Sequence, residues 1–170
     1  MRKGFTLVEL MISISILSIV MIFLYKSYAS LNHLNTKYAK GVKEIKKEEL
    51  RKEVLFLDFS LAFKNSVAVL NQNKKTDVVF LQSSHSIHRR YNPYIAYIVN
   101  DSKLYRLESL NQFKTYPLSA DSEFSIEYFG EVNSFRVYKS HDIKDESFLV
   151  HIDFSHDEDI LLKINILDSL

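Results

Sequence analysis

The sequence predicts an α+β protein in which one long N-terminal helix precedes an antiparallel β-sheet domain. Three observations predict this fold class: an apolar run of 20 residues near the N-terminus, a helical repeat of apolar residues beyond it, and short β-branched and aromatic runs later in the chain. At 170 residues, the chain is long enough for one globular domain and an appended segment.

The composition is that of an ordinary globular protein and excludes several classes. Hydrophobic residues make up 46% of the chain and charged residues 25%, which excludes a wholly disordered protein. The 22 lysines and arginines nearly balance the 21 aspartates and glutamates, so no global basic field indicates nucleic-acid binding. Because the chain has no cysteine, disulfides, thiolate zinc sites, iron–sulfur clusters and thiol catalysis are excluded.

The apolar run extends from Phe5 to Leu24 and contains one charged residue, Glu9. As a helix with a rise of about 1.5 Å per residue it would be roughly 30 Å long, which matches the hydrocarbon core of a bilayer. Three serines in the run can donate their hydroxyls to the helix backbone: Ser13, Ser15 and Ser18. A short basic leader, Met1–Gly4, precedes the run, so the chain begins with an export or anchoring signal.

The segment Lys3-Gly4-Phe5-Thr6-Leu7-Val8-Glu9-Leu10 resembles the class III leader of type IV pilins and type II secretion pseudopilins. The resemblance covers about the first 25 residues and consists of a basic leader, Gly, Phe, an apolar run and Glu in a fixed order. It implies that a membrane-embedded prepilin peptidase cuts between Gly4 and Phe5 and then methylates the new amino group of Phe5. It also implies that Glu9 meets the terminal amine of a neighbouring subunit during filament assembly.

Two simpler interpretations of this region stay open. An ordinary signal peptide is cut after a small-x-small sequence, and Ser27-Tyr28-Ala29 would give an exported soluble protein released after Ala29. Alternatively, Glu9 could lie near a helix N-terminus simply because the helix dipole favours anions there. The first interpretation does not explain a carboxylate inside the apolar run, and the second explains neither Gly4 nor the basic leader.

The segment 25–68 is predicted to be the amphipathic half of the same helix. Its apolar residues recur at helical spacing and are expected to pack on the sheet: Leu31, Leu34, Tyr38, Val42, Ile45, Val54, Leu57 and Leu61. Lysines and glutamates are interleaved between them, which favours a solvated face over a helix that binds DNA or anionic lipid. The predicted division is therefore a cleaved leader 1–4, a membrane helix 5–24, an amphipathic helix 25–68 and a mainly β domain 69–170.

Beyond about Lys75 the pattern becomes that of β-strands separated by polar turns. Seven strands are predicted: Val78–Gln82, Tyr94–Val99, Lys103–Glu108, Phe124–Phe129, Phe135–Lys139, Phe148–Phe154 and Ile160–Leu167. Turns are predicted at Asn100-Asp101-Ser102 and at His156–Asp159. A long helix followed by an antiparallel meander is also the pilin layout that the leader implies, so two independent patterns agree.

Within the resembled family, several features favour a minor subunit. Major pilins commonly carry a proline shortly after the membrane span and a C-terminal disulfide, whereas this chain has Tyr25-Lys26-Ser27 and no cysteine. Glu9 argues against a K-type tip subunit, which typically lacks this glutamate. The segment Tyr97–Arg106 resembles a strand–turn–strand segment of J-type minor pseudopilins.

Three polar clusters were considered as ligand sites. His85 and His88 lie in a polar stretch with no third ligand, so a solvated loop is favoured over a metal site. The densest cluster of possible ligands consists of Asp153, Asp157, Glu158 and Asp159 with His151 and His156. Its carboxylates could supply oxygen ligands to calcium, but the cluster lacks EF-hand spacing, and a charged turn is favoured. The segment His85–Arg90, with Tyr91 and Tyr94 nearby, combines basic and aromatic groups that could grip single-stranded DNA.

These patterns predict a non-catalytic minor pilin or pseudopilin subunit with no catalytic residue, metal or cofactor. It would be a single-pass bacterial inner-membrane protein with its C-terminal domain in the periplasm. The expected partners are other pilin or pseudopilin subunits, the prepilin peptidase and an inner-membrane assembly platform. A DNA-binding minor subunit of a transformation pilus is the alternative, although nucleic acid as a partner has no support in the sequence. One leader serves protein secretion, DNA uptake and surface pili, so the machine stays open.

Overall fold

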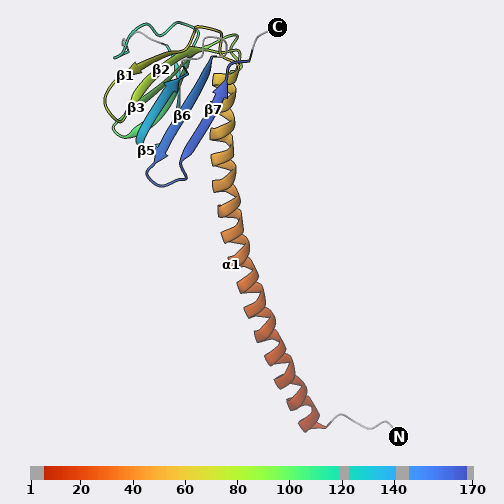
Figure 1. The fold of residues 1–170 in the computed structure, drawn as a ribbon. Coiled ribbons are helices and arrows are strands. Elements are labelled where there is room, and N and C mark those ends of the chain that lie inside the picture. Colours follow the sequence, from red (N-terminus) through yellow and green to blue (C-terminus); the bar gives the residue numbers. More distant parts are fainter. Residues whose placement is uncertain (1–5, 119–122, 141–145, 168–170) are drawn as a thin grey trace. The chain divides into compact units, whose positions relative to one another are not determined.

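A computed structural model describes residues 6–118, 123–140 and 146–167. It contains helix α1 (Leu7–Ser60) followed by seven strands (Figure 1). The strands are β1 (Ala68–Asn71), β2 (Asp77–Gln82), β3 (Tyr94–Asn100), β4 (Lys103–Ser109), β5 (Ser125–Lys139), β6 (Ser147–Phe154) and β7 (Ile160–Asn165). The predicted α+β order, one long helix and then an antiparallel sheet, is confirmed.

The chain divides into two compact units, residues 1–47 and 48–170, and α1 contributes to both. No described side chain from Thr6 to Leu50 is buried, and the buried residues of α1 all lie in its last turns: Arg51, Leu55, Asp58, Phe59 and Ser60. The apolar residues from Leu31 to Ile45, which were predicted to pack on the sheet, belong to the first unit and are exposed. The sheet is covered by the helix residues after Leu50, where Leu55 and Phe59 become fully buried.

The sheet is a simple meander, because its spatial order is the order of the strands in the chain, β1 to β7, and every neighbouring pair is antiparallel. The predicted turn between β3 and β4 is present: Asn100 pairs with Lys103, and the two residues between them have positive φ, 48° at Asp101 and 59° at Ser102. Positive φ at both central residues is the feature of a type I′ hairpin, whose twist matches that of the strands. The predicted turn at His156–Asp159 also lies between two strands, β6 and β7.

Three boundaries differ from the prediction. The helix ends at Ser60, several residues before the predicted limit at 68. The short strand β1 was not predicted, since its four residues carry too little pattern to distinguish them from a loop. The predicted strands Phe124–Phe129 and Phe135–Lys139 are one strand, β5, which is irregular around Gly130 to Ser134 and so loses its alternation there.

The second half of β5 is hydrogen-bonded to residues at the start of β2 and in the turn before it. The amide of Phe135 donates to the carbonyl of Lys75 at 3.0 Å, and the amide of Val137 donates to Oδ2 of the fully buried Asp77 at 2.9 Å. The Arg136 guanidinium lies 3.4 Å from the same carboxylate oxygen. The Asp77 side chain thus supplies an acceptor where no neighbouring strand does, which satisfies a buried backbone donor.

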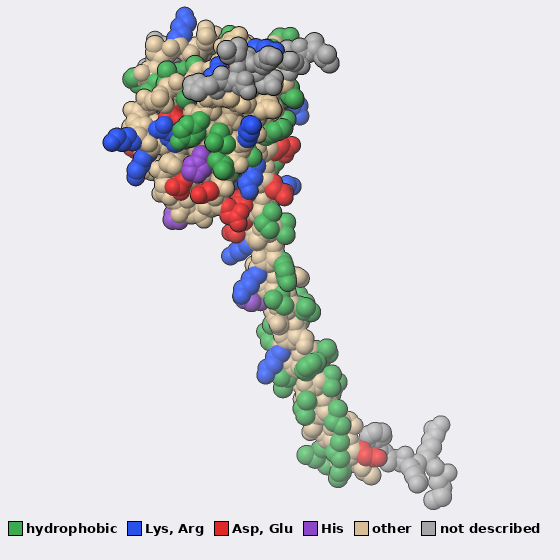
Figure 2. All heavy atoms as spheres, viewed as in Figure 1, with side chains coloured by type: hydrophobic (Ala, Val, Ile, Leu, Met, Phe, Trp, Pro, Cys, Tyr) green, Lys and Arg blue, Asp and Glu red, His purple; other side chains and the backbone are tan. Residues whose placement is uncertain are grey.

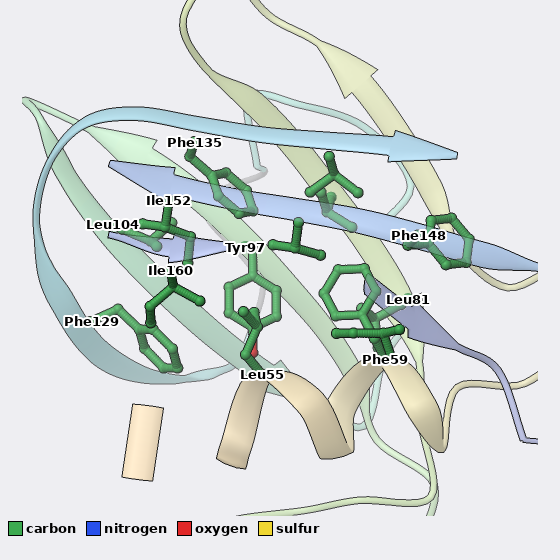
Figure 3. Packing of buried hydrophobic residues seen from close by; sticks show 14 of the residues in the cluster. Leu55, Phe59, Leu81, Tyr97, Leu104, Phe129, Phe135, Phe148, Ile152 and Ile160 are labelled. Atoms are coloured by element: carbon green, nitrogen blue, oxygen red, sulfur yellow. The ribbon is translucent and has the colours of Figure 1, made fainter. Parts of the chain in front are cut away.

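The main core lies between the last turns of α1 and the inner face of the sheet (Figure 3). The Tyr97 ring on β3 lies at its centre, with its centroid 6.1 Å from that of Phe59, 5.5 Å from Phe129 and 6.1 Å from Phe135. A second cluster on the other face of β2, β3 and β4 is covered by residues that follow β4, among them Phe113 and Phe124. Both faces of these strands are therefore buried, which explains why β2 and β3 read as continuous apolar runs.

A tight contact between Gly130, Phe154 and Arg51 fixes the helix against β5 and β6. The Arg51 guanidinium carbon lies 5.0 Å from the centre of the Phe154 ring, and the guanidinium also pairs with Asp157. Gly130 has φ +145°, and a Cβ built on it would lie 2.8 Å from the Phe154 ring and 3.3 Å from Arg51. Only glycine satisfies both the backbone angle and the space.

We expect Gly130→Ala to lower the free energy of unfolding by about 2–4 kcal/mol, since it combines backbone strain with a steric clash in the core. The measurement is urea unfolding of residues 26–170. Gly41→Ala in the same fragment is the matched control, because no atom lies within 4 Å of its added Cβ. Equal stability of the Gly130→Ala and wild-type fragments would contradict the described contact.

We also expect residues 48–170 to unfold at the same temperature as residues 26–170. No described side chain between 26 and 47 is buried, so removing this stretch costs the domain no core. The measurement is thermal unfolding followed by near-ultraviolet circular dichroism, which reports on the packed aromatic rings. A marked loss of stability in the shorter fragment would show that the domain needs the earlier part of the helix.

Candidate functional site

The N-terminal signal is described from Thr6 onward, so the predicted processing residues Gly4 and Phe5 lie outside the described residues. Glu9 lies in the first turn of α1, and Thr6 directly precedes the helix. The amide of Glu9 donates to the Thr6 hydroxyl at 3.3 Å, while the Thr6 amide and hydroxyl donate to the Glu9 carboxylate at 3.0 and 3.1 Å. This is a capping box, which satisfies amides at the helix start within one chain.

The capping box gives Glu9 an intramolecular role, which is more specific than the predicted helix-dipole interaction. A Thr followed three residues later by Glu at the start of an apolar run was the signal that could have indicated it. The carboxylate is exposed in the single chain. The intramolecular role and the predicted contact with a neighbouring subunit are therefore both available to this side chain.

The apolar run forms a helix surface covered with hydrophobic side chains (Figure 2). In the described part of the chain, α1 is the one helix long and apolar enough to cross a membrane. The three serines behave as predicted, because each hydroxyl donates to the carbonyl four residues earlier at 2.8 Å: Ser13 to Glu9, Ser15 to Met11 and Ser18 to Ile14. The three serine hydroxyls are thus hydrogen-bonded without water.

A buried charged cluster joins the end of α1 to the sheet. Asp58 on α1 and Arg106 on β4 are both fully buried, and the guanidinium Nε and Nη2 of Arg106 donate to the two carboxylate oxygens of Asp58 at 2.7 and 3.1 Å. The Tyr97 hydroxyl donates to the same carboxylate at 2.6 Å, and His85 Nδ1 lies 2.6 Å from it. Four strong contacts therefore converge on one helical carboxylate, which fixes the helix on β3 and β4.

The cluster extends from Arg106 to two further carboxylates. Its Nη1 donates to Glu108 at 2.8 Å and to Glu127 at 3.2 Å. Burial alone would raise the pKa of Glu108, but hydrogen bonds from Ser86 and Arg106 lower it below its usual value. Burial together with the nearby Asp58 charge raises the pKa of Tyr97 well above its usual value, so Tyr97 stays a neutral hydrogen-bond donor.

The segment His85–Arg90, considered as a DNA grip, is tied to this cluster. The Ser86 hydroxyl donates to Glu108 at 2.6 Å, and His88 Nε2 lies 3.2 Å from Glu127. The Arg90 guanidinium donates to the Glu108 carbonyl and to the Ser125 hydroxyl. His85 and His88 therefore face different carboxylates, and the polar groups of the segment hold the loop against the sheet.

Two carboxylates of the acidic cluster, which could in principle bind calcium, have partners within the domain. Asp157 pairs with Arg51, and Asp153 accepts a hydrogen bond from Asn133 at 2.9 Å. Over the described ranges of the chain, no group of three or more His, Asp or Glu side chains is placed to hold a metal ion.

Asp58 and Arg106 were not among the residues predicted to form a site. Leu104, Arg106 and Glu108 occupy alternate positions of one strand, so their side chains lie on the same face of the sheet. This places the Arg106 cation on the inner face. Asp58 similarly interrupts the apolar sequence Leu55-Phe56-Leu57-Asp58-Phe59 at the end of a helix. An inward cation on a predicted strand and an inward anion on the predicted helix together are a signal for a buried pair.

Comparison with known proteins identifies the N-terminal segment. Residues 1–25 match the model of the prokaryotic N-terminal methylation motif. The chain thus carries the signal of type IV pilins and pseudopilins on an α+β layout that is pilin-like. Such a signal implies a substrate of prepilin peptidase that assembles with other pilins, and together with the apolar helix it fits a protein anchored in the inner membrane. No curated protein and no solved structure matched the chain.

We expect Asp58→Ala to lower the free energy of unfolding of residues 26–170 by about 3–5 kcal/mol, because it leaves the buried Arg106 without its main counter-ion. The control is Glu146→Ala, which removes the partner of the half-exposed Lys139 and the acceptor of the Asn65 amide at 3.1 Å. Because both contacts lie at the surface, the change should cost about 1 kcal/mol. Urea unfolding of the three proteins gives both values. A cost for Asp58→Ala no larger than that of the control would mean that the cluster does not fix the helix.

Proposed function

We propose that the protein is a minor pilin or pseudopilin, a non-catalytic subunit of a filament-building machine of the bacterial inner membrane. Prepilin peptidase removes residues 1–4 and methylates Phe5, and the apolar helix holds the chain in the membrane with its C-terminal domain in the periplasm. An assembly platform then incorporates the subunit beside other pilins or pseudopilins. The observation that carries the proposal is the methylation motif at residues 1–25, which runs directly into the single helix α1.

The contacts of the domain support a structural role. Three polar groups whose pKa values are shifted are buried in the domain: Arg106, Tyr97 and Glu108. Arg106 pairs with Glu108, and the Tyr97 hydroxyl donates to the helix. These groups stabilise the fold. In this proposal the protein acts through assembly, and the domain presents a surface to neighbouring subunits or to cargo.

A minor subunit, with a J-type pseudopilin as the specific candidate, fits the chain better than a major pilin. The segment Tyr97–Arg106, which resembles a J-type segment, forms the β3–β4 hairpin. The chain has no cysteine for the C-terminal disulfide loop of a major pilin. The DNA-binding alternative has less support, because Ser86, His88 and Arg90 make their polar contacts within the domain.

Processing gives the first test of this function. We expect the mature chain to begin at Phe5 with one added methyl group, and we expect Gly4→Val to keep the full-length precursor in the membrane, because a branched side chain blocks the backbone at the scissile bond. Intact-mass measurement of the membrane-extracted protein reads both results. A mature chain that begins after Ala29 would instead identify an ordinary exported protein.

The role of Glu9 in assembly gives the second test, in which Glu9→Gln is compared with Glu9→Leu. Gln preserves the capping box but removes the charge, whereas Leu removes both. If the carboxylate meets the terminal amine of a neighbour, both variants should be cut normally and both should join the filament poorly, because a buried amine without its partner costs about 3–5 kcal/mol.

The measurement is recovery of each variant with sheared filament, or with the complex of minor subunits, at matched membrane levels. Wild-type recovery of Glu9→Gln together with loss of Glu9→Leu would assign Glu9 to the capping box alone. The comparison therefore separates the contact between subunits from the contact inside the helix.

A further inference from the structure

A polar cleft of about 790 Å³ opens at one end of the sheet and shares no residue with the buried charged cluster. One wall is the turn between β1 and β2, residues 72–76, and the other is the tip of the β3–β4 hairpin, residues 100–102. Val99, Val132 and Tyr116 give the cleft its apolar lining. Small-molecule sites have volumes of roughly 300–1,000 Å³ and often lie at the mouth of a curved sheet. The cleft therefore has the size and the position of a ligand site.

Both walls of the cleft are held by the same strand, β5. On one side, Nη1 of Arg136 donates to the carbonyls of Asn73 and Lys74, each at 3.1 Å. On the other side, the amide of Val132 donates to the carbonyl of Ser102 at 2.8 Å. The Asn73 side chain also accepts two amides of its own turn at 2.8 Å. The cleft is therefore formed before any ligand arrives, and binding does not have to order its walls.

The polar side chains around the cleft offer hydrogen-bonding groups that the described part of the chain leaves unused. These side chains are Gln72, Thr76, Asn100, Ser102 and Tyr116. A side-chain hydroxyl or amide can both donate and accept a hydrogen bond. Sugar hydroxyls have the same property, and an acetamido group adds one amide donor and one acceptor. The unused groups of the cleft therefore match the polar groups of an amino sugar.

The charges of the cleft restrict the ligand further. Lys74 and Lys75 lie on the turn wall and Asp101 lies at the hairpin tip, and within the described ranges no ion pair joins them. Two cations beside one anion are a poor match for a polyanion such as nucleic acid. An apolar ligand is also disfavoured, because it would remove the polar rim from water without giving it partners. A polar ligand of low charge fits best.

A polypeptide is a weaker match than a glycan. Extended peptides are commonly bound as an added strand along the edge of a sheet. The edge strands of this sheet are β1 and β7, and neither contributes a residue to the cleft. A sugar ring, in contrast, presents hydroxyls around its rim and C–H groups on its faces. Those faces suit the apolar surface of Tyr116 and the two valines beside it.

We propose that this cleft binds a glycan of acetylated amino sugars, with the sugar rings against Tyr116 and Val132 and their acetamido and hydroxyl groups at Gln72 and Asn100. The two unpaired lysines of the turn favour a glycan that also carries carboxylates. This inference goes beyond the proposed function and does not depend on it, because every lining residue lies in the unit 48–170.

The test is ligand binding to the full chain in detergent micelles, followed by saturation-transfer difference NMR. The two probes are the neutral disaccharide di-N-acetylchitobiose and the cell-wall disaccharide of N-acetylglucosamine and N-acetylmuramic acid, which adds a carboxylate. They distinguish a neutral surface glycan from an acidic cell-wall glycan as the source of this chemistry. We expect both to bind, and the acidic disaccharide to bind several-fold more tightly.

Three variants assign the binding to the cleft. The double variant Gln72→Ala and Asn100→Ala removes two exposed amides and should raise the Kd of both probes about ten-fold, through the loss of two hydrogen bonds. Gln112→Ala is the matched control, because it removes an exposed amide from a different cleft and should leave both Kd values unchanged. Changing Lys74 and Lys75 together to Gln should abolish the preference for the acidic disaccharide.

Several results would overturn the proposal. No saturation transfer to either disaccharide, or an unchanged Kd in the double variant, would mean that the cleft does not bind amino sugars. Binding of the acidic disaccharide alone, lost with the two lysines and unaffected by the double variant, would identify a simple anion site. Stronger binding of a neutral tetrapeptide of glycine, serine and asparagine than of either disaccharide would assign the cleft to a polypeptide.

Discussion

The ion pair between Asp58 and Arg106 is the interaction on which the arrangement of the domain depends. Two fully buried charges are costly unless each is paired and hydrogen-bonded. Here the Asp58 carboxylate makes close polar contacts with the side chains of Arg106, Tyr97 and His85. The burial of Leu55 and Phe59 follows, because both lie within one turn of Asp58 and face the same strands. A purely apolar helix end could rotate or slide on the sheet, whereas a carboxylate with directional partners allows one orientation.

This fixed helix end divides α1 into stretches with different environments. The first carries apolar side chains and serines whose hydroxyls return to the backbone, which suits a bilayer. The middle carries exposed apolar side chains between interleaved lysines and glutamates: Leu31, Leu34, Tyr38 and Ile45. Only the last turns, from Arg51 to Ser60, serve the domain's own core. One continuous helix therefore combines an apolar first stretch, an exposed middle stretch and a last stretch buried against the sheet.

Sequence patterns predicted what depends on periodicity and missed what depends on long-range contact. The helix, six of the seven strand positions and the Asp101-Ser102 turn follow from local spacing and turn chemistry. The exposed state of Leu31 to Ile45 could not be predicted, because an amphipathic pattern reports that a face will be covered and not by what. Asp58 and Arg106 were missed because a charged residue is usually assigned to the surface, and its burial depends on a partner 48 residues away.

The closure of the sheet by Asp77 has a consequence for the order in which the domain folds. Each strand of the meander pairs with its neighbour in the chain, so most backbone pairing closes short loops and carries a small entropic cost. The bond from the Val137 amide to Asp77 spans 60 residues, and the bonds from Arg106 to Asp58 span 48. These long-range contacts contribute their full stabilisation only when the strands between them have already formed. The hairpins should therefore form first, and the capture of the helix should be among the last steps, so that a newly made domain acquires its attachment to α1 after its sheet.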